Sequence, residues 1–380
     1  MSTSGNLTSQ DTLLSELYNT TVQSVVSITT NVDPRFIDPA DNDNGDNRSS
    51  LFHGSVDVPL GFGSGFVYDR DGHIVTNYHV LEGGTSADVK FLNGNSYSAT
   101  LVGKDPLSDL AVLQIDPAAL FSEKLVPLEL GSSSALNVGQ QVVAIGNPVG
   151  IFSGTLTEGI VSQLNGIFPD LARGVYNSGL IQIDVPITHG NSGGPLLNLE
   201  GRVVGITTLG YNNPNDPTAP IGFINFAIPS NKIARIVPEL ISNGTYQHAW
   251  LGIDVIDVTP YIAKNIGLSE ARGSIVYAVS PGSPADIAGI STGNADNRIS
   301  VLANLFGIVH DKIDINSDAD VIIGVDDKQI RQRADLVNYI DSKSVGDTVT
   351  LKIIREGIIR NMEATLAKSS ANQTSVSTLA

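Results

Sequence analysis

The residues most able to do chemistry are a serine and its glycine neighbours in Thr188-His-Gly-Asn-Ser-Gly-Gly-Pro-Leu196. Glycines around a serine suit a β-turn, which is one interpretation. The other is a nucleophile, Ser192, beside converging backbone N–H groups that a substrate can approach only where side chains are absent. A lone Gly-x-Ser-x-Gly is a weak signal, and the strand-to-helix context of a hydrolase elbow is missing. The full Gly-Asn-Ser-Gly-Gly-Pro string is more specific and favours the nucleophile.

This string resembles the nucleophile loop of chymotrypsin-fold serine proteases, in the form found in the HtrA/Deg family. The resemblance implies an upstream general base and an orienting carboxylate, in the order His, Asp, Ser. The chain has six histidines, and His79 lies in Thr76-Asn-Tyr-His-Val80, which resembles the family's Thr-Asn-x-His-Val. His79 is therefore the expected base.

Two carboxylates, Asp105 and Asp109, follow His79 by 26 and 30 residues. Asp109 directly precedes the apolar run Leu110–Ile115 and matches the family's Asp-Leu-Ala-Val. Asp105 precedes a proline in a turn, where turn formation is the ordinary role of Asp. We therefore expect Asp109 to be the orienting carboxylate.

The resemblance assigns the roles. Ser192 attacks the substrate carbonyl, His79 takes its proton, and Asp109 fixes the imidazole tautomer, which leads to an acyl-enzyme that water hydrolyses. The expected oxyanion hole consists of backbone N–H groups of Gly190, Asn191 and Ser192. No metal or organic cofactor is implied.

Substrate selection is predicted at two segments near the nucleophile. Where trypsin-like enzymes carry an Asp six residues before the serine, this chain has Pro186. The pocket is therefore expected to favour small or medium aliphatic residues before the scissile bond. Because strand side chains alternate, about half of the candidates would be core residues instead. The expected substrate-binding residues are Pro186, Ile187, Thr188, Ile206, Thr207, Thr208 and Leu209.

The C-terminal part resembles a PDZ domain. Trp250-Leu251-Gly252-Ile253 matches the family's carboxylate-binding loop, beside which a peptide adds as a strand. The stretches 280–289 and 345–351 also fit. An insertion over 291–317, with apolar residues from Val301 to Val309, departs from the family pattern, and a lid, an oligomer contact and a packed decoration all stay open for it.

The segments between these motifs have the pattern of β-strands. Between residues 61 and 228 short apolar runs alternate with Gly, Asn and Asp, which is typical of an all-β barrel or sandwich. The Gly61-Phe-Gly-Ser-Gly65 run lacks the Lys-Ser/Thr of a phosphate loop and indicates close backbone approach within a sheet. The expected fold is mainly β, with a chymotrypsin-like double β-barrel followed by an α+β PDZ domain.

A helical apolar face over 233–241 follows the barrels, with Ser230 as its expected N-cap. Pro238 predicts a kink or an early stop there. The expected divisions are an N-terminal segment leading into the first strand (1–30), a mobile acidic loop (31–60), the remainder of the protease domain (61–243), a linker (244–248), a PDZ-like domain (249–367) and a disordered tail (368–380).

Composition excludes several functions. The 22 Lys and Arg against 39 Asp and Glu give a net charge of −17, which argues against nucleic-acid or membrane-surface binding. The absence of cysteine removes disulfides, thiolate zinc sites and cysteine nucleophiles. No apolar run reaches the roughly 18 residues needed to cross a bilayer, and the polar start lacks the features of a signal peptide.

The resemblance implies an ATP-independent serine endopeptidase that acts on unfolded or misfolded proteins. Its PDZ domain would bind peptide C-termini, and the family implies a homotrimer or a multiple of trimers. The resemblance further implies a location in the cell envelope or elsewhere outside the cytoplasm. A chaperone or scaffold that holds unfolded chains with little cleavage is the alternative. An esterase or lipase would need an α/β chain with long regular helices, which this sequence lacks.

Overall fold

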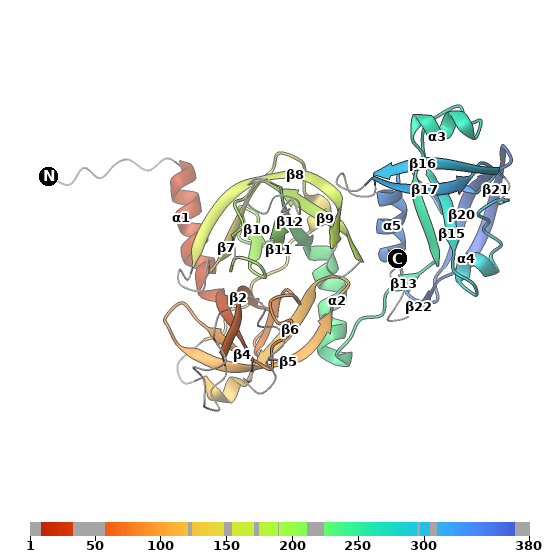
Figure 1. The fold of residues 1–380 in the computed structure, drawn as a ribbon. Coiled ribbons are helices and arrows are strands. Elements are labelled where there is room, and N and C mark those ends of the chain that lie inside the picture. The colour runs from red at the N-terminus through yellow and green to blue at the C-terminus, as the bar shows by residue number, and fades with distance from the viewer. Residues whose placement is uncertain are drawn as a thin grey trace, which may run out of the picture. The chain divides into compact units, whose positions relative to one another are not determined.

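The computed structural model describes residues 9–32, 58–120, 124–147, 154–170, 175–188, 190–210, 224–294, 297–304 and 310–368. The chain divides into two compact units, one formed by Met1–Leu164 with Leu180–Tyr246 and the other by Asn165–Gly179 with Gln247–Ala380 (Figure 1). Strands dominate both units, so the predicted mainly β fold is confirmed. Most of the predicted acidic loop and of the tail lies outside the described residues.

The first closed barrel is built from six strands in the order β1-β2-β3-β6-β5-β4. Apolar side chains at alternate strand positions fill its interior, and β6 is buried along nearly its whole length. The strands are β1 (Val25–Val32), β2 (Val58–Val67), β3 (His73–Thr76), β4 (Ser86–Lys90), β5 (Ser96–Asp105) and β6 (Leu110–Ile115).

The second closed barrel has the order β10-β11-β12-β9-β8-β7. Closure leaves neither barrel with a free sheet edge, and each encloses its own apolar core. The strands are β7 (Gln141–Gly146), β8 (Thr155–Asp170), β9 (Val175–Ile183), β10 (Pro195–Leu197), β11 (Val203–Gly210) and β12 (Asn225–Pro229).

Two helices accompany the barrels, α1 (Ser9–Thr21) and α2 (Ser230–Asn243). The early stop considered at Pro238 is wrong, because α2 continues to Asn243 and ends at Gly244, whose φ is 75°. Ser230 is not the N-cap either: Pro229 holds that position, and the Ser230 hydroxyl is bonded to another segment instead. Tertiary packing on α2 therefore outweighs the local signals.

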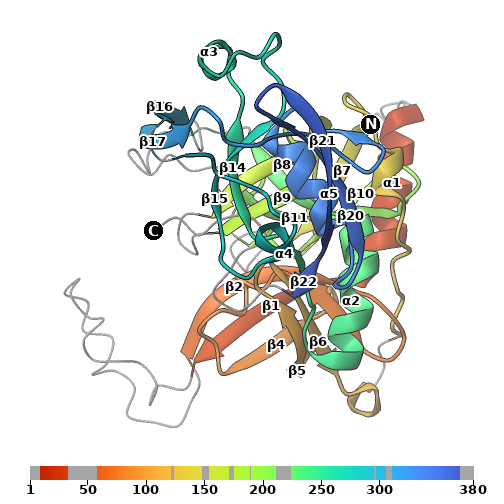
Figure 2. The same cartoon turned by 90° about the vertical axis from the view of Figure 1, so that its right-hand side faces the viewer.

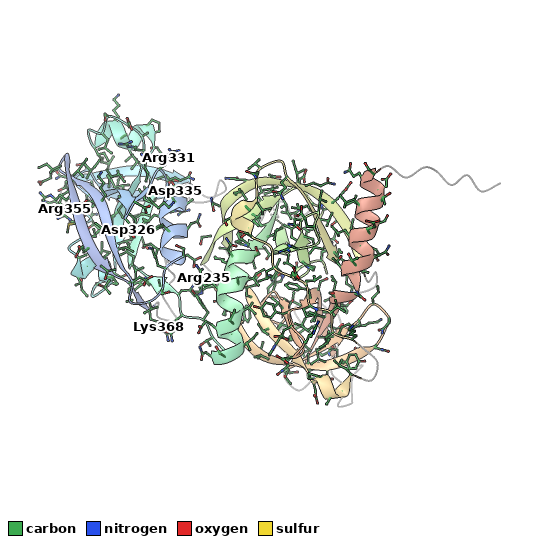
Figure 3. The ribbon with its side chains drawn as sticks, turned by 180° about the vertical axis from the view of Figure 1, so that it is seen from behind. Arg235, Asp326, Arg331, Asp335, Arg355 and Lys368 are labelled. Carbon is green, nitrogen blue, oxygen red and sulfur yellow. The ribbon has the colours of Figure 1, made fainter. Side chains whose placement is uncertain are left out.

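The second unit contains the sheet β14-β15-β18-β20-β21, with β19 paired to β18, and a short pair β13–β22. Its strands are β13 (Ala249–Trp250), β14 (Ile253–Asp257), β15 (Ser274–Val279), β18 (Val321–Val325), β19 (Lys328–Gln329), β20 (Thr348–Arg355), β21 (Ile358–Thr365) and β22 (Ala367–Lys368), and its helices are α3 (Pro260–Asn265), α4 (Pro284–Ile287) and α5 (Arg333–Asp341). At the start of α5, the Asp335 carboxylate accepts from the N–H groups of Arg331 and Gln332 (Figure 3).

The insertion is an antiparallel hairpin of β16 (Arg298–Asn304) and β17 (His310–Asn316), which forms a small sheet of its own (Figure 2). Ile315 is 1% exposed, and Ile299 packs against the same apolar cluster. At the hairpin's base the fully buried Asp320 accepts from Arg355 and from Ser291 N–H. The hydrogen bonds between Arg355 and the Asp320 carboxylate hold the pKa of the Arg355 guanidinium above its ordinary value. The base of the insertion is thus packed into the unit.

The first prediction concerns the first barrel. Ile28 is fully buried on β1, so Ile28→Ala should lower the free energy of unfolding by about 2–5 kcal/mol through lost burial and a cavity. The matched control, Leu101→Ala, removes a half-exposed side chain from β5 and should change it by no more than about 0.5 kcal/mol. Urea titrations measure both. Equal losses would contradict the assignment of Ile28 to the core.

Candidate active site

Ser192 lies in a tight turn between β9 and β10 whose glycines are required by packing. Gly190 and Gly193 have φ of 100° and 87°, in the left-handed region that favours glycine. A Cβ at Gly193 would overlap Ser64 O and Thr76 Oγ1, and one at Gly194 would lie 2.5 Å from Ile145 O. The sequence interpretation that these glycines serve substrate access is therefore incomplete, because Gly193 and Gly194 let the turn pack against its support.

Backbone hydrogen bonds hold this turn between the two barrels. The Ser192 carbonyl accepts from Ser64 N–H on β2, at 2.8 Å. Gly193 N–H donates to Thr207 O on β11, also at 2.8 Å, and Thr207 N–H donates to Gly194 O at 2.9 Å. Ser192 is therefore fixed from both sides by strands of separate closed barrels.

His79 and Asp109 form a hydrogen-bonded pair. His79 Nδ1 lies 2.7 Å from Asp109 Oδ2, and His79 N–H donates to Oδ1 at 2.9 Å. The carboxylate thus contacts both the ring and the backbone of the histidine, which fixes the ring orientation and leaves Nε2 for another partner. The Asp109 side chain is 3% exposed and that of His79 is 18% exposed.

Asp109 is held in a conformation that its neighbours determine. Its φ is 54°, a left-handed value that costs a non-glycine residue on the order of 1–2 kcal/mol. Its carbonyl accepts from Tyr78 N–H and Asn77 Nδ2, and its Oδ2 also accepts from Thr208 Oγ1 at 2.9 Å. Backbone strain, burial and three donors on the carboxylate coincide at this residue, which is typical of a functional site.

Asp105, the other candidate, is buried as well, but its Oδ1 accepts from Leu107 N–H in the turn before β6. It therefore has the turn-forming contact that its sequence context predicts. The histidine contacts belong to Asp109.

The histidine segment and the serine turn meet at Gly63 on β2. A Cβ there would lie 2.5 Å from Val80 Cγ1, beside His79, and 3.2 Å from the Ser192 carbonyl oxygen. Among the residues that the structure describes, no hydrogen bond joins Ser192 Oγ to His79. Contacts between nucleophile and base are often long in the resting state and tighten when substrate binds.

The backbone N–H groups of Gly190, Asn191 and Ser192, which are the three expected oxyanion donors, differ in their hydrogen bonding. Asn191 N–H donates to Thr188 O at 3.0 Å, so this group closes the turn. The N–H groups of Gly190 and Ser192 flank it. They are the two candidates for stabilising negative charge on a substrate oxygen.

The predicted substrate-binding residues divide into two groups. Pro186 and Thr188 are exposed, and Ile187 is partly buried against the second core. Ile206, Thr207 and Thr208 are buried, and the Thr207 hydroxyl donates to Asn191 O while that of Thr208 donates to Asp109. The two threonines therefore support the site, and His189 and the Leu209 side chain lie outside what the structure describes.

Sequence reasoning missed two supporting residues. Ser64 contacts the serine turn through both backbone and hydroxyl, and Asn225 Nδ2 donates to Val185 O, next to Pro186, at 2.7 Å. Ser64 lies in the run Gly61–Gly65, for which close backbone approach is confirmed, because a Cβ added at Gly65 would lie 3.0 Å from the carbonyl oxygen of Val75 on the neighbouring strand. That run was the available signal for Ser64, whereas Asn225 had none.

The predicted carboxylate-binding loop of the second unit lies between β13 and β14. Gly252 has φ of 83°, and a Cβ there would overlap Ser283. The carbonyls of Leu251 and Gly252 accept from Ala285 N–H and Ser280 N–H. Because a trans peptide points its N–H opposite to its C=O, the N–H groups of Gly252 and Ile253 point away from the Ser280–Ala285 segment. They lie at the start of β14, an edge strand of the sheet.

Comparison with known proteins defines the class. A family model described as a trypsin-like peptidase domain matches residues 63–206, and one described as a PDZ domain matches residues 249–366. The chain therefore combines a trypsin-like peptidase domain with a PDZ domain. It belongs to the HtrA family of serine proteases.

Three relatives illustrate this membership. "Probable periplasmic serine endoprotease DegP-like" of Bartonella henselae is 39% identical over 308 residues, which cover 81% of this chain and 53% of the relative. "Serine protease Do-like HtrB" of Bacillus subtilis is 35% identical over 326 residues, covering 82% of this chain and 63% of the relative. The solved structure "HtrA-type protease AlgW with decapeptide" has a TM-score of 0.65 at 26% identity, covering 94% of this chain and 98% of that chain. The chain thus spans between half and two thirds of the length of the two curated relatives from Bartonella henselae and Bacillus subtilis.

The second prediction separates the two carboxylates. Asp109→Asn should lower kcat by about 10⁴-fold, because an amide at this position favours the wrong tautomer of His79. Asp105→Asn is the matched control, since an Asn side chain can accept the same turn hydrogen bond, and it should leave kcat near the wild-type value. Steady-state kinetics on a peptide ester measure both. A larger loss in the Asp105 variant would contradict the assignment.

Proposed function

We propose that the protein is an ATP-independent serine endopeptidase that cleaves unfolded or misfolded proteins. The observation that carries this proposal is the 2.7 Å contact between His79 and the buried Asp109, next to a serine turn that both barrels hold. A triad of this kind activates a serine hydroxyl that is otherwise a poor nucleophile.

The chemistry follows the order of proton transfers. His79 Nε2 takes the proton from Ser192 Oγ as the oxygen attacks the substrate carbonyl, and Asp109 stabilises the imidazolium. The N–H groups of Gly190 and Ser192 stabilise the oxyanion, and loss of one such donor typically costs on the order of 100–1,000-fold in turnover. His79 then protonates the leaving amine. In the second half, a water molecule gives a proton to His79 as it attacks the acyl group, and His79 returns that proton to Ser192 Oγ as the acid product leaves.

Substrate preference rests on the segment before the serine. Position 186 carries Pro in place of an acidic residue, and Ile187 packs against the apolar core. A basic side chain would find no carboxylate at that position. The site should therefore accept small or medium aliphatic residues before the scissile bond.

In this proposal the PDZ domain binds the C-terminus of a peptide or protein chain. A peptide that adds as a strand beside β14 would place its terminal carboxylate at the N–H groups of Gly252 and Ile253. Several relatives carry the name "Probable periplasmic serine endoprotease DegP-like", which supports an extracytoplasmic location. We further propose assembly as a homotrimer or a multiple of trimers, as the family resemblance implies.

The third prediction tests the activity itself. Wild-type protein should degrade casein without ATP and react with a fluorophosphonate probe at Ser192, whereas Ser192→Ala should do neither, because it lacks the nucleophilic oxygen. Casein gels and in-gel fluorescence measure the two activities. Binding of unfolded casein with neither cleavage nor labelling would favour the chaperone alternative, and unchanged cleavage by Ser192→Ala would refute the site.

The fourth prediction concerns the carboxylate loop. A fluorescent peptide with an amidated C-terminus should bind about 10- to 100-fold more weakly than its free-acid form, because it lacks the charge-assisted hydrogen bonds. Gly252→Ala should remove this difference, since its Cβ overlaps Ser283. Gly267→Ala is the matched control, with φ of 73° but no atom within 4 Å of the added Cβ, and it should keep the difference.

Fluorescence anisotropy, with Ser192→Ala in every chain to prevent cleavage, measures both peptides on the parent chain, on Gly252→Ala and on Gly267→Ala. Equal affinity for acid and amide in the parent chain would contradict carboxylate recognition at this loop.

A further inference from the structure

Ser64 makes four hydrogen bonds around the serine turn, although it is not one of the predicted catalytic residues. Its side chain is fully buried on β2. Its N–H donates to Ser192 O at 2.8 Å, and its carbonyl accepts from Thr76 Oγ1 at 2.7 Å. Any residue at this position would supply those backbone groups. The hydroxyl contacts described next depend on serine itself.

The Ser64 hydroxyl joins two segments of the second barrel. It donates to Gly190 O at 2.6 Å and accepts from Asn147 N–H, at the end of β7, at 2.9 Å. Both groups lie in buried residues, so without the hydroxyl two buried polar atoms would lose a partner.

The contact with Gly190 acts on the peptide plane between the two candidate oxyanion donors. This plane joins Gly190 to Asn191, with Ser64 Oγ on its C=O and Thr188 O on its N–H. The N–H groups of Gly190 and Ser192 belong to the preceding and following planes. A rotation of the central plane would turn both donors away from a common point.

Gly190 makes such a restraint necessary. With no Cβ and φ of 100°, its backbone has access to conformations that other residues cannot adopt. The Thr188 contact lies within the same turn and would move with it. The Ser64 hydroxyl, in contrast, comes from the first barrel and is held by Thr76 and by the β2 ladder.

We propose that Ser64 is a positioning residue that sets the oxyanion hole by fixing the Gly190–Asn191 peptide through its hydroxyl. This inference rests on the proposed endopeptidase function. Ser64 stabilises the transition state through the donors it aligns, and it leaves ground-state binding and the His79–Asp109 pair unchanged. The expected signature is thus a loss in kcat without a matching rise in KM.

The experiment compares Ser64→Ala with Ser230→Ala. Ser230 is an equally buried serine whose hydroxyl donates to Gly131 O at 2.7 Å and accepts from Ser133 N–H at 3.0 Å, so its loss removes the same two kinds of hydrogen bond away from the turn. Ser64→Ala should lower kcat about 10- to 100-fold, less than the full loss of one oxyanion donor, with KM within about twofold. Ser230→Ala should keep wild-type kcat.

A peptide boronate, which forms a tetrahedral adduct on the serine, provides the second readout. Its affinity for Ser64→Ala should fall by about the same factor as kcat, because both depend on oxyanion stabilisation. Affinity for the same peptide with a non-reactive amide end should not change, and the pH profile of kcat/KM should keep its wild-type midpoint. A merely structural defect would affect the substrate-like peptide and the boronate alike.

Ser64→Cys covers the case in which Ser64→Ala does not fold, with Ser230→Cys as its control. A thiol is a weaker hydrogen-bond donor than a hydroxyl, so the kcat of Ser64→Cys should lie between those of wild type and Ser64→Ala. Wild-type kcat and boronate affinity in a folded Ser64 variant would overturn this inference and leave the endopeptidase proposal standing. A wild-type protein that neither cleaves nor labels would overturn both.

Discussion

The arrangement around Ser192 depends on one buried carboxylate. Asp109 is almost fully buried, and a carboxylate in that environment is tolerated only when donors surround it. His79 supplies two of these donors from the first barrel, and Thr208 supplies another from β11 of the second. The need to satisfy this charge therefore fixes the histidine ring, the start of β6 and the position of β11 together.

The serine turn is subject to a second constraint, which is close packing without side chains. Gly193 lies against Ser64 O and Thr76 Oγ1, and Gly194 lies against Ile145 O. Only glycine lets the turn reach the strands that hold it. The two closed barrels provide fixed positions for these strands, and backbone hydrogen bonds join the serine turn to both of them. This fixed placement is what the proposed oxyanion hole requires.

The parts of the fold and of the candidate site that depend on a local sequence signal could be predicted. The strand over 110–115 and the position of Asp109 before it follow from an apolar run and a short motif, and the PDZ domain follows from its loop motif. Features that depend on distant contacts could not be predicted. The continuation of α2 past Pro238, the hairpin in the insertion, and the hydroxyl contacts of Ser64 and Thr208 result from packing between segments far apart in the chain. For the same reason, the sequence pattern predicts substrate contacts for Thr207 and Thr208 on β11. In the structure the Thr207 hydroxyl donates to Asn191 O, and the Thr208 hydroxyl donates to the Asp109 carboxylate.

The central claim is that Ser192 becomes covalently acylated with help from the pair His79–Asp109. Mass spectrometry of an acid-quenched reaction with an activated peptide ester tests this most directly. We expect the acyl mass on the proteolytic fragment that contains Ser192, at close to one equivalent in wild type and at a small fraction of this in Asp109→Asn at the same early time. An acyl group on another residue, or turnover of the ester with no acylated fragment, would contradict the account.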